Sequence, residues 1–194
     1  MAALRWVVPP SRRPPPLVTP ASLDAAARDY LTRWFTTRAH LRRLLLRRVD
    51  RSIAAHGGDR AALADAIDRV LDRLAAAGAL DDGAYARDKT RSLLRRGVSE
   101  AGVRQRLSAR GLGEARVREA LDAVRETGVD PAVGAACAYV RRRRLGPYRY
   151  DPDVRKEHRD KDLAALGRAG FSYAVARAVL DLESPADVEA RILD

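Results

Sequence analysis

The chain has 194 residues, of which 46% are hydrophobic but only 5% aromatic, and it carries a formal net charge of +11. Its single cysteine, Cys137, excludes an intramolecular disulfide and a zinc site built on cysteines. No stretch approaches the roughly 18 apolar residues of a membrane span, and the opening MAALRWVVPP does not resemble a signal peptide. We therefore expect a protein of the reducing cytoplasm with no membrane partner.

The composition also indicates the fold class. Alanine, leucine and arginine dominate the sequence, and all three are good helix formers. No alternating run of β-branched and aromatic residues is long enough for a convincing strand, so we expect an all-α fold. Nearly all of the 37 basic residues are arginine, which a GC-rich coding bias could produce. The excess of positive charge is concentrated in the N-terminal half, however, and this asymmetry favours a polyanionic partner or an acidic protein surface.

Prolines mark the first segment of the chain. Residues 1–20 hold six of the ten prolines and show no helical period, which predicts a disordered Pro/Arg-rich arm. Helix signals then come in three groups. They predict three tandem three-helix repeats over 22–78, 80–128 and 130–194, in an elongated, solenoid-like stack.

The first group should begin with a helix that Ser22 caps and that runs to about Arg33. A second helix is expected over about 37–55. Asp59 should cap the third helix, whose apolar residues recur at helical spacing until Gly78 ends it.

The second group follows the same pattern. Its first helix is expected over about 82–96, and Ser99 should cap a second helix that ends at Gly111. The third helix is expected over about 114–126, before Gly128.

The third group should start with a helix from Pro131 to about Arg144, followed by a loop of sequence LGPYRYDP and a helix over about 154–169. Its expected caps are Asp130, Ser172 and Ser184, the last with Asp187 in a capping box.

Two segments support a repeat. VRQRLSARGLGEARVREAL (103–121) and DLAALGRAGFSYAVARAVL (162–180) share a leucine, a glycine, an alanine, an arginine and a second leucine at matching positions. The shared glycine lies between two predicted helices, where a left-handed residue lets the chain turn sharply.

The stretch LDDGAYAR (80–87) contains paired aspartates that a metal site or an acid/base pair would also use. Asp81 and Asp82 precede a predicted helix, however, where carboxylates accept backbone N–H bonds and favour the helix dipole. The three histidines have no metal-site spacing, and no phosphate loop or nucleophile elbow occurs. Cys137 lies in an alanine-rich helical segment typical of a buried small residue. We expect no enzyme, no metal and no cofactor.

The basic residues are the candidate functional residues. The run 141–144 spans about 300° of a helix, so its members cannot all face one phosphate track, and they could equally satisfy the helix dipole. Tyr148 and Arg149 could stack on bases and bind phosphate, or hold the loop against its own domain. Arg106 and Arg110 lie four residues apart and repel each other unless an anion lies between them. The predicted partner- or DNA-binding residues are Arg43, Arg47, Arg95, Arg96, Arg104, Arg106, Arg110, Arg141, Arg142, Arg143, Arg144, Tyr148 and Arg149.

Two motifs carry a family resemblance. LAAAGALDDGAYA at 74–86 and RAGFS at 168–172 resemble landmarks of the RecX family, the regulators of the RecA recombinase, and the similarity covers about 22–193. The segment WFTTRAHL at 34–41 departs from the family pattern. Trp34 and Thr36 stand where the family has arginines, His40 replaces a glutamate, and Thr37 replaces a serine but keeps the capping hydroxyl.

The resemblance implies a non-enzymatic monomer that binds RecA filaments on single-stranded DNA and binds nucleic acid directly only weakly. It would limit the recombinase, ATPase and coprotease activities of RecA. An alternative is a general nucleic-acid-binding helical protein without recombinase specificity, and a third possibility is a helical scaffold without DNA contact. Base reading is disfavoured, because Gln105 is the only glutamine and the chain has no asparagine.

Overall fold

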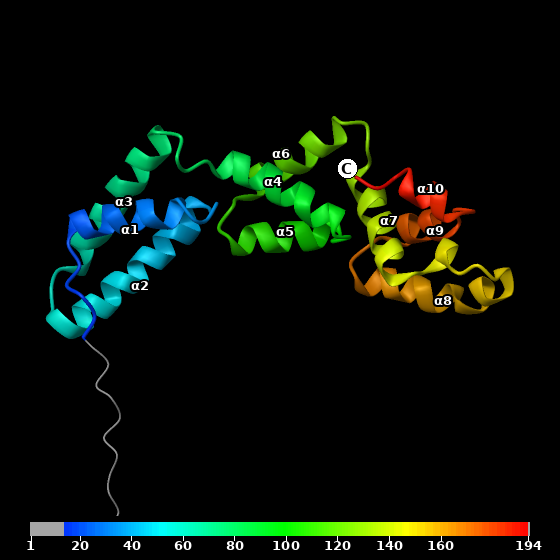
Figure 1. The fold of residues 1–194 in the computed structure, drawn as a ribbon, viewed down its shortest axis with the longest axis horizontal. Helices are drawn as coiled ribbons and strands as arrows, with labels where there is room; N and C mark the ends of the chain where they lie inside the picture. Colours follow the sequence, from blue (N-terminus) through cyan, green and yellow to red (C-terminus); the bar gives the residue numbers. More distant parts are fainter. Residues whose placement is uncertain (1–13, 194) are drawn as a thin grey trace, which may run out of the picture. The chain divides into compact units, whose positions relative to one another are not determined.

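The computed structural model describes residues 14–193, and every regular element in that range is a helix (Figure 1). The described residues form two compact units. The first consists of Met1–Trp34, as far as it is described, and Leu41–Ala79, and the second consists of Phe35–His40 and Leu80–Asp194. The all-α prediction is confirmed. Residues 1–13 of the predicted arm lie outside the described residues.

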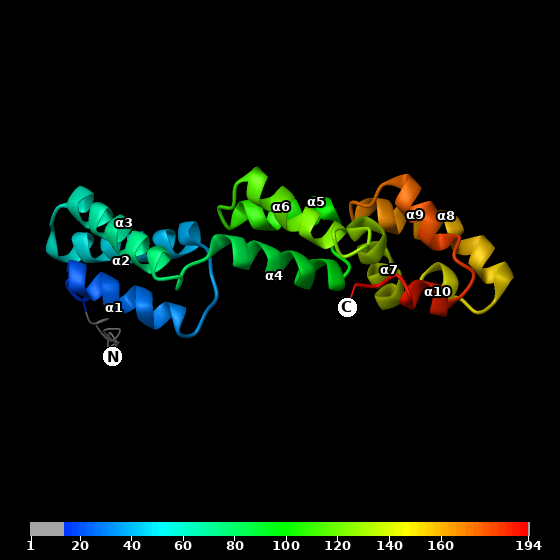
Figure 2. The same ribbon diagram turned by 90° about the horizontal axis from the view of Figure 1, so that it is seen from above.

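The first unit contains α1 (Pro20–Leu31), most of α2 (Arg38–His56) and α3 (Arg60–Ala76). Helix α1 lies against α3 in both ribbon views (Figure 1 and Figure 2). The apolar residues Leu23 and Ala27 of α1 and Ile67, Val70, Leu71 and Leu74 of α3 are buried. The predicted cap at Ser22 is wrong. Thr19 caps α1, and Ser22 completes a capping box because its hydroxyl accepts the N–H of Thr19.

The second unit contains α4–α10 and the short 3₁₀ helix η1. Helix α7 is its central element, because α4, α6, α9 and α10 all pack against it and its residues 134–140 are all buried. One continuous apolar core runs from Tyr85 on α4 to Leu193. The elements are α4 (Asp82–Arg95), α5 (Glu100–Ala109), α6 (Glu114–Arg125), α7 (Pro131–Arg143), η1 (Gly146–Tyr148), α8 (Pro152–Arg168), α9 (Tyr173–Leu180) and α10 (Pro185–Glu189).

Local capping chemistry sets most helix starts, as predicted. The confirmed N-caps are Asp59, Asp81, Ser99, Asp130, Ser172 and Ser184, the last in a capping box with Asp187. The end of α7 and the start of α8 are among the boundaries that differ from the prediction. Helix α7 ends at Arg143, since Arg144 takes a left-handed conformation, and α8 starts at Pro152 because Asp151 caps it.

The two aspartates of LDDGAYAR have different roles. Asp81 accepts the N–H groups of Gly83 at 2.8 Å and Ala84 at 2.9 Å, and the bond from Ala84 contributes most to lowering the pKa of its carboxyl. Asp82 instead accepts the N–H of Arg38, the first residue of α2, at 2.8 Å. Capping of α4 is therefore confirmed for Asp81, whereas Asp82 lies in the first turn of α4 and its carboxylate binds an N–H of a helix distant in sequence.

Candidate partner-binding surface

Within the second unit, the C-terminal ends of α4, α7 and α8 meet. Gly97 follows α4 with φ +72°, and a Cβ there would lie 2.6 Å from the backbone nitrogen of Tyr139 on α7. Arg142 of α7 donates to the carbonyl oxygen of Arg96 at 2.8 Å. Ser99, the cap of α5, donates to the carbonyl oxygen of Ala169 just after α8 at 2.8 Å. The close approach of these backbones fixes the relative positions of the three helix ends.

Arginines gather around Tyr139 at this junction. The guanidinium carbons of Arg142 and Arg143 lie 5.7 and 5.8 Å from the centre of its ring, within cation–π range. The ring itself is buried edge-on against Phe171, with centroids 5.7 Å apart. Arg143 and Arg168 line one cavity of about 540 Å³ beside the ring, and none of the six residues that line the cavity is acidic.

We call Arg95, Arg96, Arg142, Arg143 and Arg168 the arginine cluster. All five are exposed, and all five lie at or just beyond a helix C-terminus. Part of this arrangement is structural, because three helix ends carry roughly −0.5 charge each. Five guanidinium groups exceed that total by about 3.5 charges, so the junction keeps a positive excess that an anionic partner can neutralise.

The structure thus brings together four of the predicted residues and adds one. Sequence reasoning missed Arg168, although it lies in RAGFS and in the last turn before Gly170, where a basic residue is favoured. Tyr139 was also missed, because a tyrosine inside an apolar helix is usually core. Nothing in the linear sequence indicates that it lies beneath two arginines.

Other predicted residues are committed to contacts within the protein. Arg141 pairs with Glu189 on α10 at 2.9 Å, and the hydroxyl of Tyr148 donates to the same carboxylate at 2.5 Å. Burial, followed by this bond, raises the pKa of Tyr148 to about 12. Arg149 makes two bonds to the buried Asp162, at 2.9 and 3.0 Å. These contacts favour the interpretation in which Tyr148 and Arg149 hold the loop to its own domain.

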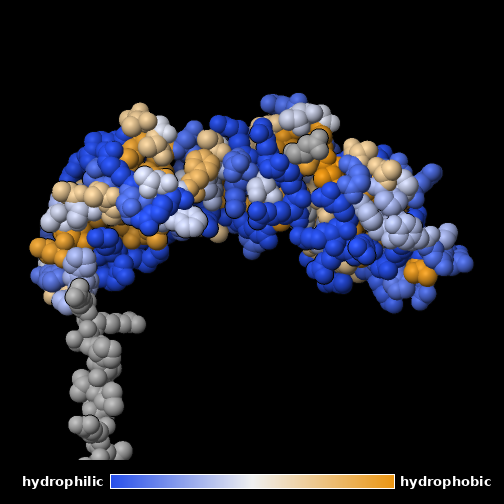
Figure 3. All heavy atoms as spheres, in the orientation of Figure 1, coloured by the Kyte–Doolittle hydropathy of each residue, from blue (hydrophilic) through white to orange (hydrophobic). Residues whose placement is uncertain are grey.

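The arginines of α5 divide into two kinds. Arg104 pairs with Glu100 at 2.9 Å, and Glu100 also accepts from Arg125 at 2.6 Å. Arg106 and Arg110 are exposed and make no ion pair within the part of the chain that the structure describes. The face drawn in Figure 3 is mostly hydrophilic over α5.

The remaining predicted residues lie apart from the arginine cluster. Arg144 is exposed just after α7. Arg43 and Arg47 are exposed on α2 in the first unit, where the neighbouring Arg42 makes a bidentate pair with Asp68 at 2.7 and 2.8 Å.

Over residues 14–193, no three histidine, cysteine, aspartate or glutamate side chains lie close enough to hold a metal ion. No helix in the same range is both long and apolar enough to cross a membrane.

Cys137 should be inert towards thiol reagents in the folded protein. Its side chain is fully buried in α7, and burial is the main cause that raises the pKa of the thiol to about 11. At pH 7.5 both accessibility and the thiolate fraction are therefore small. We expect no reaction with a colorimetric disulfide reagent until denaturant unfolds the second unit. Stoichiometric labelling of the native protein within minutes would contradict this assignment.

The fold and surface define a class of protein: an all-helical, arginine-rich protein in which basic side chains gather where helix ends meet. "Regulatory protein RecX" of Myxococcus xanthus (strain DK1622) is 41% identical over 168 residues, which cover 86% of this chain and 88% of that protein. The chain therefore belongs to the RecX family, which confirms the resemblance of its two motifs.

Further comparisons agree. "Regulatory protein RecX" of Agrobacterium fabrum (strain C58 / ATCC 33970) is 34% identical over 103 residues, which cover 53% of this chain and 52% of that protein. A solved structure, "Crystal structure of regulatory protein RecX", aligns with a TM-score of 0.57 and 24% identity, covering 84% of this chain and 72% of that one. The fold is therefore shared with that structure. No protein-family model matches the sequence.

Proposed function

We propose that this protein is a negative modulator of the RecA recombinase in the cytoplasm, binding RecA filaments on single-stranded DNA and limiting their recombinase, ATPase and coprotease activities. The observation that carries the proposal is the 41% identity to a regulatory protein RecX over 86% of the chain. In this proposal the protein acts as a monomer and without a cofactor.

We propose that the arginine cluster is part of the surface that contacts the filament. Its positive excess suits a filament that presents both DNA phosphates and acidic side chains. Arg106 and Arg110 are exposed and without ion pairs among the described residues, so they extend the proposed surface to α5. Arg43 and Arg47 would contact the filament separately, from the first unit. We do not assign this role to Arg104, Arg141, Tyr148 or Arg149, which are engaged within the protein.

Three tandem repeats over 22–78, 80–128 and 130–194, stacked in a solenoid-like manner, are part of the same proposal. Gly111 between α5 and α6 has φ +85°, and the matching Gly170 between α8 and α9 has φ +87°. The two glycines therefore make the same left-handed turn, which supports a common origin for these helix pairs. Several weak contacts along a repeating filament would add through effective concentration.

Reversing three charges of the cluster tests the function and the surface together. The single-stranded-DNA-dependent ATPase rate of the cognate RecA is measured with substoichiometric amounts of this protein. The native protein should lower the rate. The variant Arg95→Glu, Arg143→Glu, Arg168→Glu should need at least about 10-fold more protein for the same inhibition, equivalent to about 1.4 kcal/mol.

A charge-matched control separates the cluster from net charge. Arg91→Glu, Arg118→Glu, Lys156→Glu changes the net charge equally at exposed positions of the second unit outside the cluster. It should inhibit like the native protein. Equal loss in both variants would indicate a general electrostatic effect, and no inhibition by the native protein would contradict the proposed function.

The runner-up function is general nucleic-acid binding, which the positive excess of the cluster also favours. Binding to a single-stranded oligonucleotide alone would then be tight and would weaken with salt, with a slope of about −0.7 for each phosphate contact. Tight DNA binding without an effect on the RecA ATPase would favour this alternative.

A further inference from the structure

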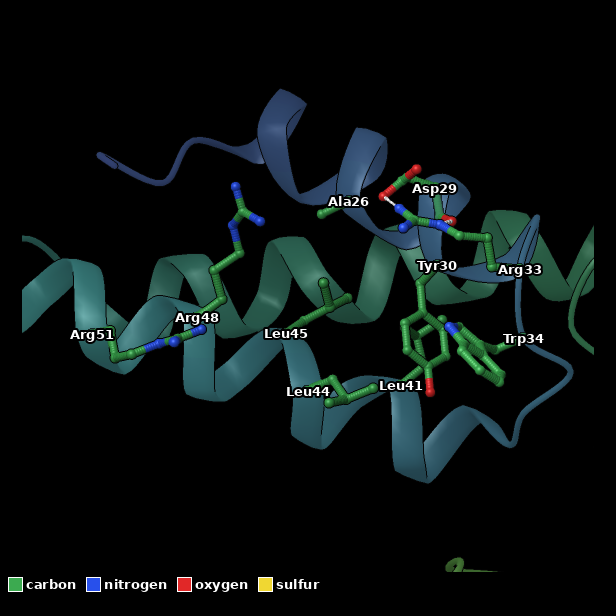
Figure 4. Close-up of a pocket in the computed structure, with 10 residues that line it drawn as sticks. All are labelled: Ala26, Asp29, Tyr30, Arg33, Trp34, Leu41, Leu44, Leu45, Arg48 and Arg51. Carbon is green, nitrogen blue, oxygen red and sulfur yellow. Dashed lines mark hydrogen bonds and ion pairs between the residues drawn. The ribbon is translucent and has the colours of Figure 1, made fainter. Parts of the chain in front are cut away.

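A pocket in the first unit combines aromatic rings with arginines. It lies between α1 and α2, has a volume of about 270 Å³, and Figure 4 shows its ten lining residues. Tyr30 and Trp34 form one end of it, Leu41, Leu44 and Leu45 line its middle, and Arg48 and Arg51 lie towards the other end. None of these residues belongs to the arginine cluster or to the predicted binding residues.

The chain just beyond α1 places the two rings together. The N–H of Trp34 donates to the carbonyl oxygen of Tyr30 at 2.9 Å, so the helical turn continues past the end of α1. Residues four apart on such a turn lie on the same face. Trp34 is 61% exposed, which is unusual for the largest apolar side chain and leaves a flat ring available to a partner.

The arginines of the pocket are not equivalent. Arg33 is paired with Asp29, the only acidic residue of the lining, so that carboxylate is already neutralised. Arg48 is half-buried, and its Nε–H is buried without a hydrogen-bond acceptor among the described residues. Arg51 is exposed, and its Nε donates to the carbonyl oxygen of Arg47 at 3.3 Å. The pocket therefore offers two guanidinium groups with donors left for an anion.

The spacing of these groups indicates the shape of the occupant. Arg48 follows Leu41 by seven residues on α2, a separation of about 10 Å along the helix axis. A flat ring at Trp34 and an anion at Arg48 would thus belong to an extended, polymeric ligand. The volume is below the range of about 300–1,000 Å³ typical of sites that enclose a whole small molecule.

We propose that this pocket binds single-stranded nucleic acid, with one base against Trp34 and Tyr30 and the neighbouring phosphates at Arg48 and Arg51. Aromatic faces with flanking arginines are how proteins bind single strands without reading sequence, since every base has a π-face. The net charge of +11 and the neutralised Asp29 favour a polyanion over an uncharged partner. The proposal rests on the proposed function only in taking nucleic acid as a ligand, and its test contains no RecA.

Tryptophan fluorescence reports on the pocket directly. The chain has two tryptophans, so Trp6→Phe in the full-length protein leaves Trp34 as the only one. Titration with a 12-nucleotide oligothymidine should quench Trp34 fluorescence to saturation. Arg48→Ala and Arg51→Ala should each weaken the affinity and reduce the salt slope by about 0.7. The control is Arg69→Ala, which removes an exposed arginine of α3 outside the pocket. It should leave the Trp34 quenching and the midpoint of the titration within about 2-fold of the native values.

Replacing Trp34 by another ring or by alanine separates a stacking role from a folding role. Binding is measured by the anisotropy of a labelled oligonucleotide, which needs no tryptophan signal. The protein with both tryptophans replaced by phenylalanine should stay within about 3-fold of native affinity, and Trp34→Ala should bind about 10-fold more weakly. Circular dichroism confirms that each variant is folded.

Three outcomes would overturn the proposal: no change in Trp34 fluorescence with oligothymidine, unchanged affinity of a folded Trp34→Ala variant, or a response to an acidic phenylalanine-containing peptide but not to DNA. Each is independent of the RecA assay, so this site and the proposed function can fail separately.

Discussion

Replacing Gly97 with alanine should lower the free energy of unfolding by about 2–5 kcal/mol. Its left-handed backbone, with φ +72°, costs an L-residue about 1–2 kcal/mol. The new Cβ would also lie 2.6 and 2.7 Å from the backbone nitrogen and Cα of Tyr139, atoms that move only if α4 and α7 separate. Such overpacking typically costs about 1–3 kcal/mol more.

Gly128→Ala is the matched control for this prediction. Gly128 has φ +83° in the same unit, but a Cβ there would meet no atom within 4 Å. It should cost only the backbone strain, about 1–2 kcal/mol. Chemical denaturation of both variants measures the difference. Equal losses would show that the α4–α7 approach tolerates a methyl group, and the geometry of the arginine cluster would then not depend on Gly97.

Replacing Arg149 with methionine should destabilise the protein by about 3–5 kcal/mol at pH 7. Asp162 is 3% exposed, and within the described residues its salt-bridge partner is Arg149. Removing that partner leaves a buried carboxylate with only the N–H of Gly146, at 3.0 Å. The double variant Arg149→Met, Asp162→Leu should recover most of the loss, because apolar residues of similar size can replace a buried pair.

The contribution of Asp162 to the pH dependence of stability should have opposite signs in the native protein and in the Arg149→Met variant. Burial alone would raise the pKa of Asp162, but Arg149 and the N–H of Gly146 together lower it below 3.8. Because the pKa of Asp162 is lowered by folding, this group stabilises the folded protein at pH values above 3.8, the pKa of the unfolded chain. The stabilisation is lost as the pH falls through the lower pKa of the folded protein.

Without Arg149, burial dominates and raises the pKa of Asp162. The penalty of Arg149→Met should therefore shrink as pH falls from 7 towards 5, as measured by urea denaturation at several pH values. A penalty that is constant across this range would show that Asp162 is not an uncompensated buried charge in the variant.

The sequence by itself determined the features that depend on neighbouring residues. The all-α class, the glycine stops and most caps follow from interactions within four residues, as the bonds of Asp81 to Gly83 and Ala84 illustrate. Family membership was also readable, because LAAAGALDDGAYA and RAGFS are local motifs.

Only the tertiary structure decided which charged residues are engaged. Arg141 and Glu189 are 48 residues apart and Arg142 and Arg96 are 46 apart, so no local pattern could distinguish a paired arginine from one in the cluster. The same holds for Asp82, whose carboxylate binds an N–H of a helix 44 residues away. A guanidinium group binds whichever acceptor the packing of the helices brings within about 3 Å, and that distance is a property of the fold rather than of the neighbouring sequence.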